Sequence, residues 1–331
     1  MRAFLFLTLA GWIATDAAAH HSHTGFDLER VVAFEGSVVR YEWVNPHVYL
    51  TVSDENGDEW LIETDPTPVM SRSGWTRESF AAGDSVAIRA HPDRRSGRHH
   101  GLLLSLEMSD GTTMASWNST TQDTHAGPDA VAGSLEGVWQ GERSSLKDFV
   151  VMLADHPLTA AGAAEKAEYS QLLNPTLACI TWPTPFILSS YLYLSEMSFG
   201  DDTIVFRNEF YGTQRTIWMN GRAHPEKVER SLQGHSIGWW EGDTLVVDTV
   251  GFEDHRSPYG SGTGIPSGAQ KHVIERYRLS DDGSHATIEI LLEDPEYLAE
   301  PATATFVWRY SPHFEMLELG CDEEVASRFT E

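Results

Sequence analysis

The chain has 331 residues, with 23 Lys+Arg against 49 Asp+Glu, so its formal net charge at neutral pH is −26. This charge disfavours nucleic acid and anionic membrane surfaces as partners, because both are bound through clustered basic side chains. A hydrophobic fraction of 41% is typical of a globular protein and excludes the collagen-like and disordered classes. The length predicts about two domains.

Residues 1–19 are typical of a secretory signal peptide. Arg2 gives a positive start, residues 3–13 are apolar, and Ala17, Ala18 and Ala19 provide small residues before a cleavage site. The apolar stretch is too short to cross about 30 Å of hydrocarbon, and no later segment is long enough either. We therefore expect a periplasmic or secreted protein with no membrane span.

The two cysteines, Cys179 and Cys321, are 142 residues apart. An even cysteine count in an oxidising compartment predicts one disulfide. Closing so long a loop stabilises the fold by about 4–5 kcal/mol in the chain-entropy model.

Residues 116–133 are rich in Ser, Thr, Gly and Asp, which is typical of an exposed linker. They divide the chain into domains at 24–115 and 134–331. We expect these two domains to be separable by limited proteolysis.

The first domain shows alternating strand patterns and one short helical segment. Strands are expected at residues 34–43, 48–52, 60–64, 85–89 and 102–106, with a helical turn at 67–74. Five short strands with a helix between the third and fourth predict a small OB-like β-barrel.

The second domain is also predicted to be mainly β. One helical excursion is expected from Thr159 to about residue 173. Strands are expected at residues 137–139, 186–194, 203–210, 215–219, 236–240, 244–250, 272–279, 287–292, 303–310 and 314–319. This spacing predicts an antiparallel up-and-down barrel or a strongly curved sheet. Gly137-x-Trp139 resembles the opening of lipocalin-like barrels, which can hold one small ligand.

Histidines gather at the expected mature N-terminus. Cleavage after Ala19 would make His20 the first residue, whose amine and imidazole can together chelate Cu(II), and cleavage one residue earlier would place His21 third, a pattern that also binds Cu(II) or Ni(II). His47 follows Pro46, which restricts the local backbone, so His47 is the candidate for a further ligand. The alternatives are a solvated tail and a packed histidine. No other cofactor is expected.

Polar side chains also lie among the aromatic residues of the second domain. The catalytic candidates are His235, Asp248, His272 and Arg215, and the ligand-binding candidates are Tyr211, Arg215, Trp239, Trp240 and Glu275. Strand alternation puts His272 and Arg276 on one face, with Glu275 and Tyr277 on the other. A histidine and a carboxylate inside a barrel could act as a general acid/base pair. The alternative is a buried ion-pair network or a solvent face.

Two sets of motifs resemble uncharacterised families. His20-His21-Ser22, Trp43-x-Asn45-Pro46-His47 and Gly74-Trp75-Thr76-Arg77 resemble exported bacterial proteins of unknown function. Gly234-His235-Ser236-x-Gly238 and the segment at 240–249 (WEGDTLVVDT) are similar to an equally uncharacterised β-rich region of exported proteins. The resemblance implies a compartment and domain boundaries, and no activity.

Three functions therefore remain open from the sequence. The first is a binding protein for a small apolar or mixed-polarity ligand in the periplasm or outside the cell. The second is a cofactor-free hydrolase, lyase or isomerase acting in the C-terminal barrel. The third is copper binding through the N-terminal histidines.

Overall fold

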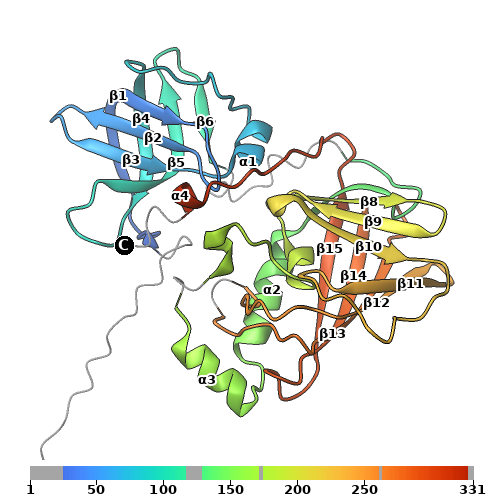
Figure 1. The fold of residues 1–331 in the computed structure, drawn as a ribbon. Coiled ribbons are helices and arrows are strands. Elements are labelled where there is room, and N and C mark those ends of the chain that lie inside the picture. The colour runs from blue at the N-terminus through green and yellow to red at the C-terminus, as the bar shows by residue number, and fades with distance from the viewer. Residues whose placement is uncertain (1–24, 117–128, 171–173, 261–262, 327–331) are drawn as a thin grey trace, which may run out of the picture.

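The computed structural model describes residues 25–116, 129–170, 174–260 and 263–326. These residues form two β-barrels, each with its own cluster of buried apolar side chains (Figure 1). In the described part of the chain, no helix has both the length and the apolar character needed to span a bilayer.

The N-terminal barrel follows the expected OB-like pattern. Its elements are β1 (Val32–Glu42), β2 (Tyr49–Asp54), β3 (Glu59–Glu63), α1 (Thr67–Arg72), β4 (Ser85–Pro92), β5 (His100–Met108) and β6 (Thr113–Ala115). The sheet order is β3-β2-β1-β4-β5-β6, and β3 also pairs with β5 in parallel, which closes five strands into a barrel. The five expected strands and the helix are confirmed, and the short β6 is an additional strand.

Local side-chain contacts explain two of the bends in this barrel. The carboxylate of Asp54 accepts hydrogen bonds from the backbone N–H groups of Asn56 (2.9 Å) and Asp58 (3.0 Å), which fixes the turn between β2 and β3. The amide oxygen of Asn45 accepts from the N–H of Thr67 (2.9 Å) and so holds the start of α1.

The C-terminal barrel has nine strands in chain order. They are β7 (Gly137–Gly141), β8 (Leu194–Phe199), β9 (Thr203–Asn208), β10 (Thr213–Trp218), β11 (His235–Glu241), β12 (Thr244–Val250), β13 (His272–Leu279), β14 (His285–Glu293) and β15 (Ala302–Tyr310). Because β15 pairs with β7, the barrel is closed. The pairings are antiparallel except for β10 with β11, which run parallel across a long connection.

The segment before β8 departs from the sequence expectation. Residues 186–189 form a 3₁₀ helix, η5 (Phe186–Ser189), instead of a strand, because Pro183 and Pro185 precede it and cannot donate to a sheet. Residues 314–319, predicted to be a strand, form an irregular segment. The strand predicted at residues 186–194 overlaps the observed β8 only at residue 194.

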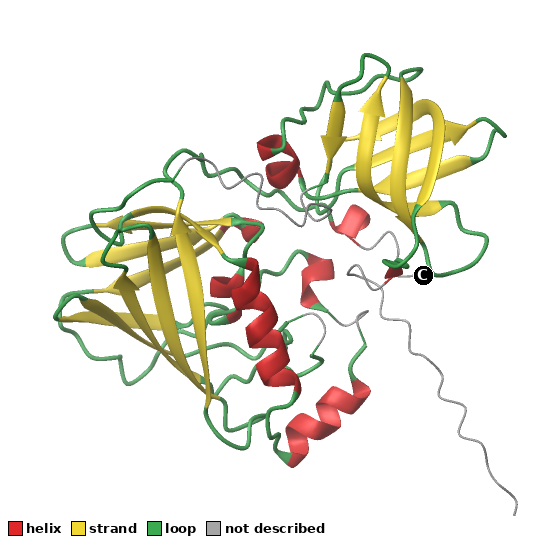
Figure 2. Ribbon diagram, turned by 180° about the vertical axis from the view of Figure 1, so that it is seen from behind, coloured by secondary structure: helices red, strands yellow, loops and turns green. Residues whose placement is uncertain are grey.

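Helices cover one side of this barrel (Figure 2). The expected helix begins at Thr159, whose hydroxyl accepts from the N–H of Gly162 (3.0 Å), and it is shorter than predicted: α3 spans Ala160–Glu168. A second helix, α2 (Arg143–Ala154), was not predicted. It lies along the barrel wall, where Phe149 packs edge-on against Phe306 of β15. Short elements η4 (Pro175–Ala178), η6 (Phe210–Gly212) and α4 (Glu323–Ala326) complete the fold.

The predicted disulfide is confirmed. It joins Cys179, just after η4, to Cys321, just before α4, with 5.7 Å between the two Cα atoms. The bond ties the C-terminal segment that follows β15 to the segment between α3 and β8.

Candidate functional site

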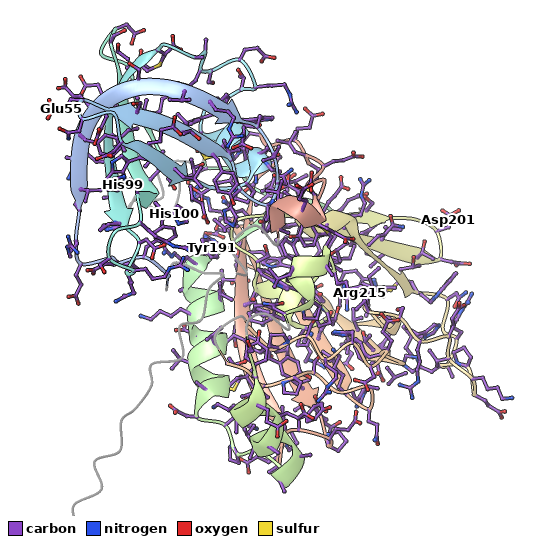
Figure 3. The ribbon with its side chains drawn as sticks, turned by 60° about the vertical axis from the view of Figure 1, so that its left-hand side comes forward. Glu55, His99, His100, Tyr191, Asp201 and Arg215 are labelled. Carbon is purple, nitrogen blue, oxygen red and sulfur yellow. A yellow bond between two sulfur atoms is a disulfide. The ribbon has the colours of Figure 1, made fainter. Side chains whose placement is uncertain are left out.

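The centre of the C-terminal barrel is occupied by a buried ion pair. The guanidinium of Arg215 (β10) donates two hydrogen bonds to the carboxylate of Glu275 (β13), at 2.7 and 2.8 Å. The hydroxyl of Tyr277 donates to the same carboxylate (2.6 Å), and the guanidinium lies over the ring of Phe206. Burial alone would lower the pKa of Arg215, but Glu275 raises it, so Arg215 stays charged. Figure 3 marks Arg215 within this domain.

The other ligand-binding candidates do not converge on this ion pair. Trp239 and Trp240 are 40% and 47% exposed at the end of β11. Tyr211 lies in η6, where its ring stacks on Phe210 and burial raises its pKa to about 12. The structure therefore brings together Arg215 and Glu275 alone among the predicted ligand-binding residues.

Three of the four catalytic candidates meet on the outer face of the barrel. His272 is bonded to Glu293 through Nδ1 (2.8 Å) and to Asp248 through Nε2 (2.9 Å). The same Asp248 oxygen lies 3.4 Å from Nε2 of His224, and Nδ1 of His224 is 2.8 Å from Nδ1 of His235. These five residues form a continuous chain of side chains, and Arg215 lies on the other side of the barrel wall.

This chain of five side chains has a charged end and a neutral end. The hydrogen bond between His272 and Asp248, together with the one to Glu293, raises the pKa of His272 to about 9, and His272 in turn lowers the pKa of Asp248. Burial, with a contribution from His224, lowers the pKa of His235. At neutral pH a proton is therefore held at His272, while His235 is an unprotonated base.

A second polar group lies behind this outer chain, inside the end of the barrel. Its members have polar side-chain atoms that are buried and lack a hydrogen-bond partner among the described residues: His255 Nε2, Ser257 Oγ, Ser267 Oγ, Lys271 Nζ and Asp294 Oδ1. We call these five residues the Lys271 cluster. Buried polar atoms are nearly always hydrogen-bonded, so five such atoms in one region mark a site that is built to meet polar groups.

Strand alternation explains why the two polar groups lie back to back. His272 of β13 is paired with Glu293 of β14, and both face outward. The adjacent residues, Lys271 and Asp294, therefore face inward, with exposed fractions of 1% and 2%.

The loop between β12 and β13 builds most of the Lys271 cluster. It folds into the barrel end rather than over the surface: residues 257–260 and 263–268 are buried. Arg230 holds its two ends together by donating to the carbonyl oxygens of Phe252 (2.6 Å) and Ala269 (2.8 Å). Ser267 N–H donates to the carbonyl of Ser257 (2.9 Å), which brings the two serines to one place.

Contacts around Lys271 are mainly with aromatic rings. Its ammonium nitrogen lies 4.2 Å from the ring centre of Phe252 and 5.7 Å from that of Tyr259. The Oδ2 atom of Asp294 accepts from the hydroxyl of Tyr259 (2.8 Å) and from the N–H of Gly268 (2.7 Å). The cluster thus combines aromatic rings with polar side chains.

Burial dominates the electrostatics of this cluster. It lowers the pKa of Lys271 to about 7, although Asp294 opposes the change. It also lowers the pKa of His255 to about 3, with Lys271 adding to the effect, and it raises the pKa of Asp294. Near neutral pH the imidazole is uncharged and the amine is close to half-protonated.

Sequence reasoning missed the Lys271 cluster. The loop contains Gly251, Pro258, Gly260, Gly264 and Pro266, and such a composition predicts an exposed connection. The available signal was the phase of β13: Lys271 extends the inward series of Val273 and Glu275, and it is one of only four lysines in the chain.

An open groove of about 400 Å³ runs along the outer face of the same sheet. Outward side chains line it: Ile274, Arg276, Glu289, Leu291, Thr303 and Thr305.

In the N-terminal barrel, His47 lies beside a second histidine–carboxylate group. His47 Nδ1 is 2.8 Å from the carbonyl oxygen of Thr64 and 3.5 Å from Glu63 Oε1. Glu63 also approaches His100 Nε2 (3.3 Å), and His100 Nδ1 approaches Asp93 (3.4 Å). Figure 3 marks His100 on this barrel. No three His, Cys, Asp or Glu side chains within the described ranges are placed to hold a metal ion, and the metal candidates His20 and His21 lie outside these ranges.

Comparison with known proteins identifies part of the chain. Residues 9–104 match the model of a family of unknown function, DUF6152. No curated protein matches the chain.

Two solved structures are similar to about half of the chain. The REP1-NXSQ fatty acid transporter is 11% identical over 54% of this chain and 98% of its own, with a TM-score of 0.27. A point mutant of the fluorescent protein UnaG is 13% identical over 53% of this chain and 95% of its own, also with a TM-score of 0.27.

Proposed function

We propose that this is an exported binding protein whose C-terminal barrel holds a small ligand of mixed polarity at the Lys271 cluster. The observation that carries the proposal is the set of five buried, unpartnered polar atoms at one end of the barrel. Each such atom destabilises the fold by about 1–3 kcal/mol, and a ligand that bonds to them recovers that energy on binding. The barrel centre is less suited, because Arg215, Glu275 and Tyr277 already bond to one another there.

The inventory of the cluster defines the chemistry of the ligand. His255 Nδ1 accepts from the N–H of Ser257 (3.0 Å), so its proton sits on Nε2, which is a donor. Lys271 and the serine hydroxyls are donors as well, and only Asp294 Oδ1 is purely an acceptor. The ligand is therefore a small molecule with an oxygen-rich acceptor end and an apolar body that lies against Phe252 and Tyr259.

Native mass spectrometry of the exported protein, purified without a tag, tests this proposal. We expect an organic adduct on the wild type, or one formed on addition of small carboxylic acids and ketones. Lys271→Met should abolish the adduct and Lys227→Met, at an exposed position, should leave it unchanged. An adduct that survives Lys271→Met, or no adduct under any of these conditions, would overturn the assignment.

Export is part of the same proposal. The apolar segment at 3–13 followed by three alanines supports a cleaved signal peptide, and the Cys179–Cys321 disulfide is the kind of bond that persists in an oxidising compartment. N-terminal sequencing of the periplasmic and extracellular fractions should find a chain that begins at residue 19 or 20. Recovery of the intact leader in the cytoplasm would contradict this.

Copper binding at the N-terminus is a second candidate, supported by the position of His47. Phe26 packs edge-on against the ring of His100 (4.9 Å), and the N–H of Asp27 donates to Pro92. Residue 26 is thus held beside the His47–Glu63–His100 group, and an extended chain spans about 3.3 Å per residue. A chain of this length would let His20 and His21 reach that group.

A Cu(II) titration followed by electron paramagnetic resonance tests the copper candidate. On a chain that begins at His20, we expect one tight site whose spectrum shows nitrogen ligands. His47→Ala should change the spectrum, while His156→Ala, at a histidine in the other domain, should not. An unaltered affinity after a one-residue extension of the N-terminus would contradict a site built on the terminal amine.

A further inference from the structure

We infer that Lys271 is a nucleophilic amine that captures aldehydes or ketones as imines, so that the ligands of the barrel are carbonyl compounds. This inference rests on the proposed binding function and names its ligand class. It follows from where the amine lies, from what it contacts and from the groups that surround it.

The surroundings of Lys271 are those that keep an amine unprotonated. The side chain is 1% exposed, its nitrogen faces the rings of Phe252 and Tyr259, and this nitrogen has no hydrogen-bond partner among the described residues. A lysine that only stabilised the fold would be expected to pair with a carboxylate at this depth. The pKa of about 7 agrees with this geometry, since a desolvated lysine is the form that attacks carbonyl groups.

Groups that can move protons lie around the amine. Asp294, whose pKa is raised by burial, shares a hydrogen bond with Tyr259, and His255 presents an N–H to the same region. Lys271 and Asp294 both contact Tyr259, and His255 is joined to the same place through the backbone of Ser257. A carbonyl oxygen next to Lys271 would therefore have proton donors available.

The reaction balances without an oxidant or a reductant. The lone pair of Nζ forms a bond to the carbonyl carbon, and the carbonyl π electrons move to oxygen, which takes one of the N–H protons, carried by the carboxylate of Asp294. The nitrogen lone pair then expels the hydroxyl, which takes the second N–H proton through the same carboxylate and leaves as water, and the carbon–nitrogen double bond of a neutral imine forms. Water reverses each step, so the ligand is held covalently and released unchanged.

Burial of Lys271 also sets a condition on the chemistry. Because its side chain is 1% exposed, a carbonyl compound reaches the amine only when the residues that surround it move.

Reductive trapping tests the inference when the alkylated lysines of the wild-type protein are located by peptide mapping. The exported full-length chain is incubated with hexanal and sodium cyanoborohydride at neutral pH, which converts an imine into a stable alkylated lysine. Lys147, Lys166 and Lys227 are the other lysines, all more exposed, and serve as internal controls. We expect Lys271 to be alkylated faster than these three by roughly tenfold or more, because a much larger fraction of its amine is neutral at this pH.

Variants then separate the inference from the binding proposal. Lys271→Met has a side chain of similar length without a charge and cannot form an imine, so trapping at this position should disappear, whereas Lys227→Met should trap at Lys271 as the wild type does. Equal alkylation of all four lysines in the wild type would overturn the inference. If hexanal binds in a saturable and Lys271-dependent way but is not trapped, imine formation is wrong and the binding proposal stands. If hexanal and the acids and ketones above all fail to bind, both are wrong.

Discussion

Arg72 of the N-terminal barrel and Glu209 of the C-terminal barrel form a buried bidentate ion pair. The two hydrogen bonds are 2.9 and 3.0 Å long, and the side chains are 6% and 0% exposed. Glu209 also accepts from the N–H groups of Leu194 (3.0 Å) and Leu317 (2.8 Å), so it joins the interface to β8 and to the C-terminal segment.

Removing one partner of this pair should strongly destabilise the protein. We expect Arg72→Met to lower the free energy of unfolding by about 3 kcal/mol, because Glu209 would remain buried without its counter-ion. Arg207→Met is a matched control, since Arg207 pairs with Glu196 at an exposed position and should cost less than about 1 kcal/mol. Equal losses in urea denaturation would show that the domains do not dock in solution as they do here.

The same contact bears on the separability of the two domains. A protease that cuts within residues 116–133 should leave two folded fragments, because each barrel has its own core. We expect the fragments to co-elute in gel filtration for the wild type and to separate for Arg72→Met. Scattered cleavage in both halves would contradict the expected linker.

Two variants test the central ion pair of the C-terminal barrel: one removes a single charge and the other removes both. Glu275→Gln should destabilise the protein by about 3–5 kcal/mol, since the guanidinium of Arg215 is left buried without its counter-ion. The double change Arg215→Met with Glu275→Leu should recover most of this loss, because it removes both charges. Thermal unfolding of the three proteins measures the effect. If the double variant is as unstable as the single one, the pair is not a simple charge compensation.

Lys271 should make stability rise with pH. Its pKa is about 7 in the folded chain against 10.5 when unfolded, so between these values the unfolded chain binds more protons. The contribution to stability therefore increases with pH in this window, by at most about 1.4 kcal/mol per unit. Lys271→Met should be more stable than the wild type at pH 6, and the difference should shrink as the pH approaches 10. A constant difference in urea denaturation would contradict a neutral buried amine.

His272 should act with the opposite sign. Its pKa is raised from 6.5 to about 9 by Asp248 and Glu293, so its stabilising effect is complete below pH 6.5 and is lost as the pH rises through 9. His272→Asn should be less stable than the wild type at pH 6 and nearly equal at pH 9.5. Because the ring is half-buried, we expect a difference of about 1 kcal/mol. His313→Asn, at a histidine outside this chain of residues, should show no such pH window.

Local patterns in the sequence predicted much of the fold. Alternation correctly placed His272 and Glu275 on opposite faces of one strand, because a period of two is a property of the strand alone. It did not show which face is inside, since an inward Glu275 is stable only with Arg215, which is 60 residues away. The outer chain of residues was found only in part: His235, Asp248 and His272 were catalytic candidates, but His224 and Glu293 were not.

The Lys271 cluster could not be predicted in this way. Its members come from a loop and from residue 294, just beyond a strand, and the phase of β13 indicates only that Lys271 faces inward. Only the tertiary contact between residues 267–271 and residue 294 brings them together. Turn-forming residues predict that a chain bends, and they carry no information on whether the bend is buried.

Closure of the C-terminal barrel through β7 and β15 has a consequence for how the chain acquires its structure. Tyr310 pairs with Trp139, so the first and last strands meet across 171 residues. Contacts at such separation slow folding, and until they form, both strands present unpaired edges that can associate with other chains. The sheet of this domain therefore lacks free edges only once this pairing has formed, and a chain that ends before β15 would keep two open edges that are prone to aggregation.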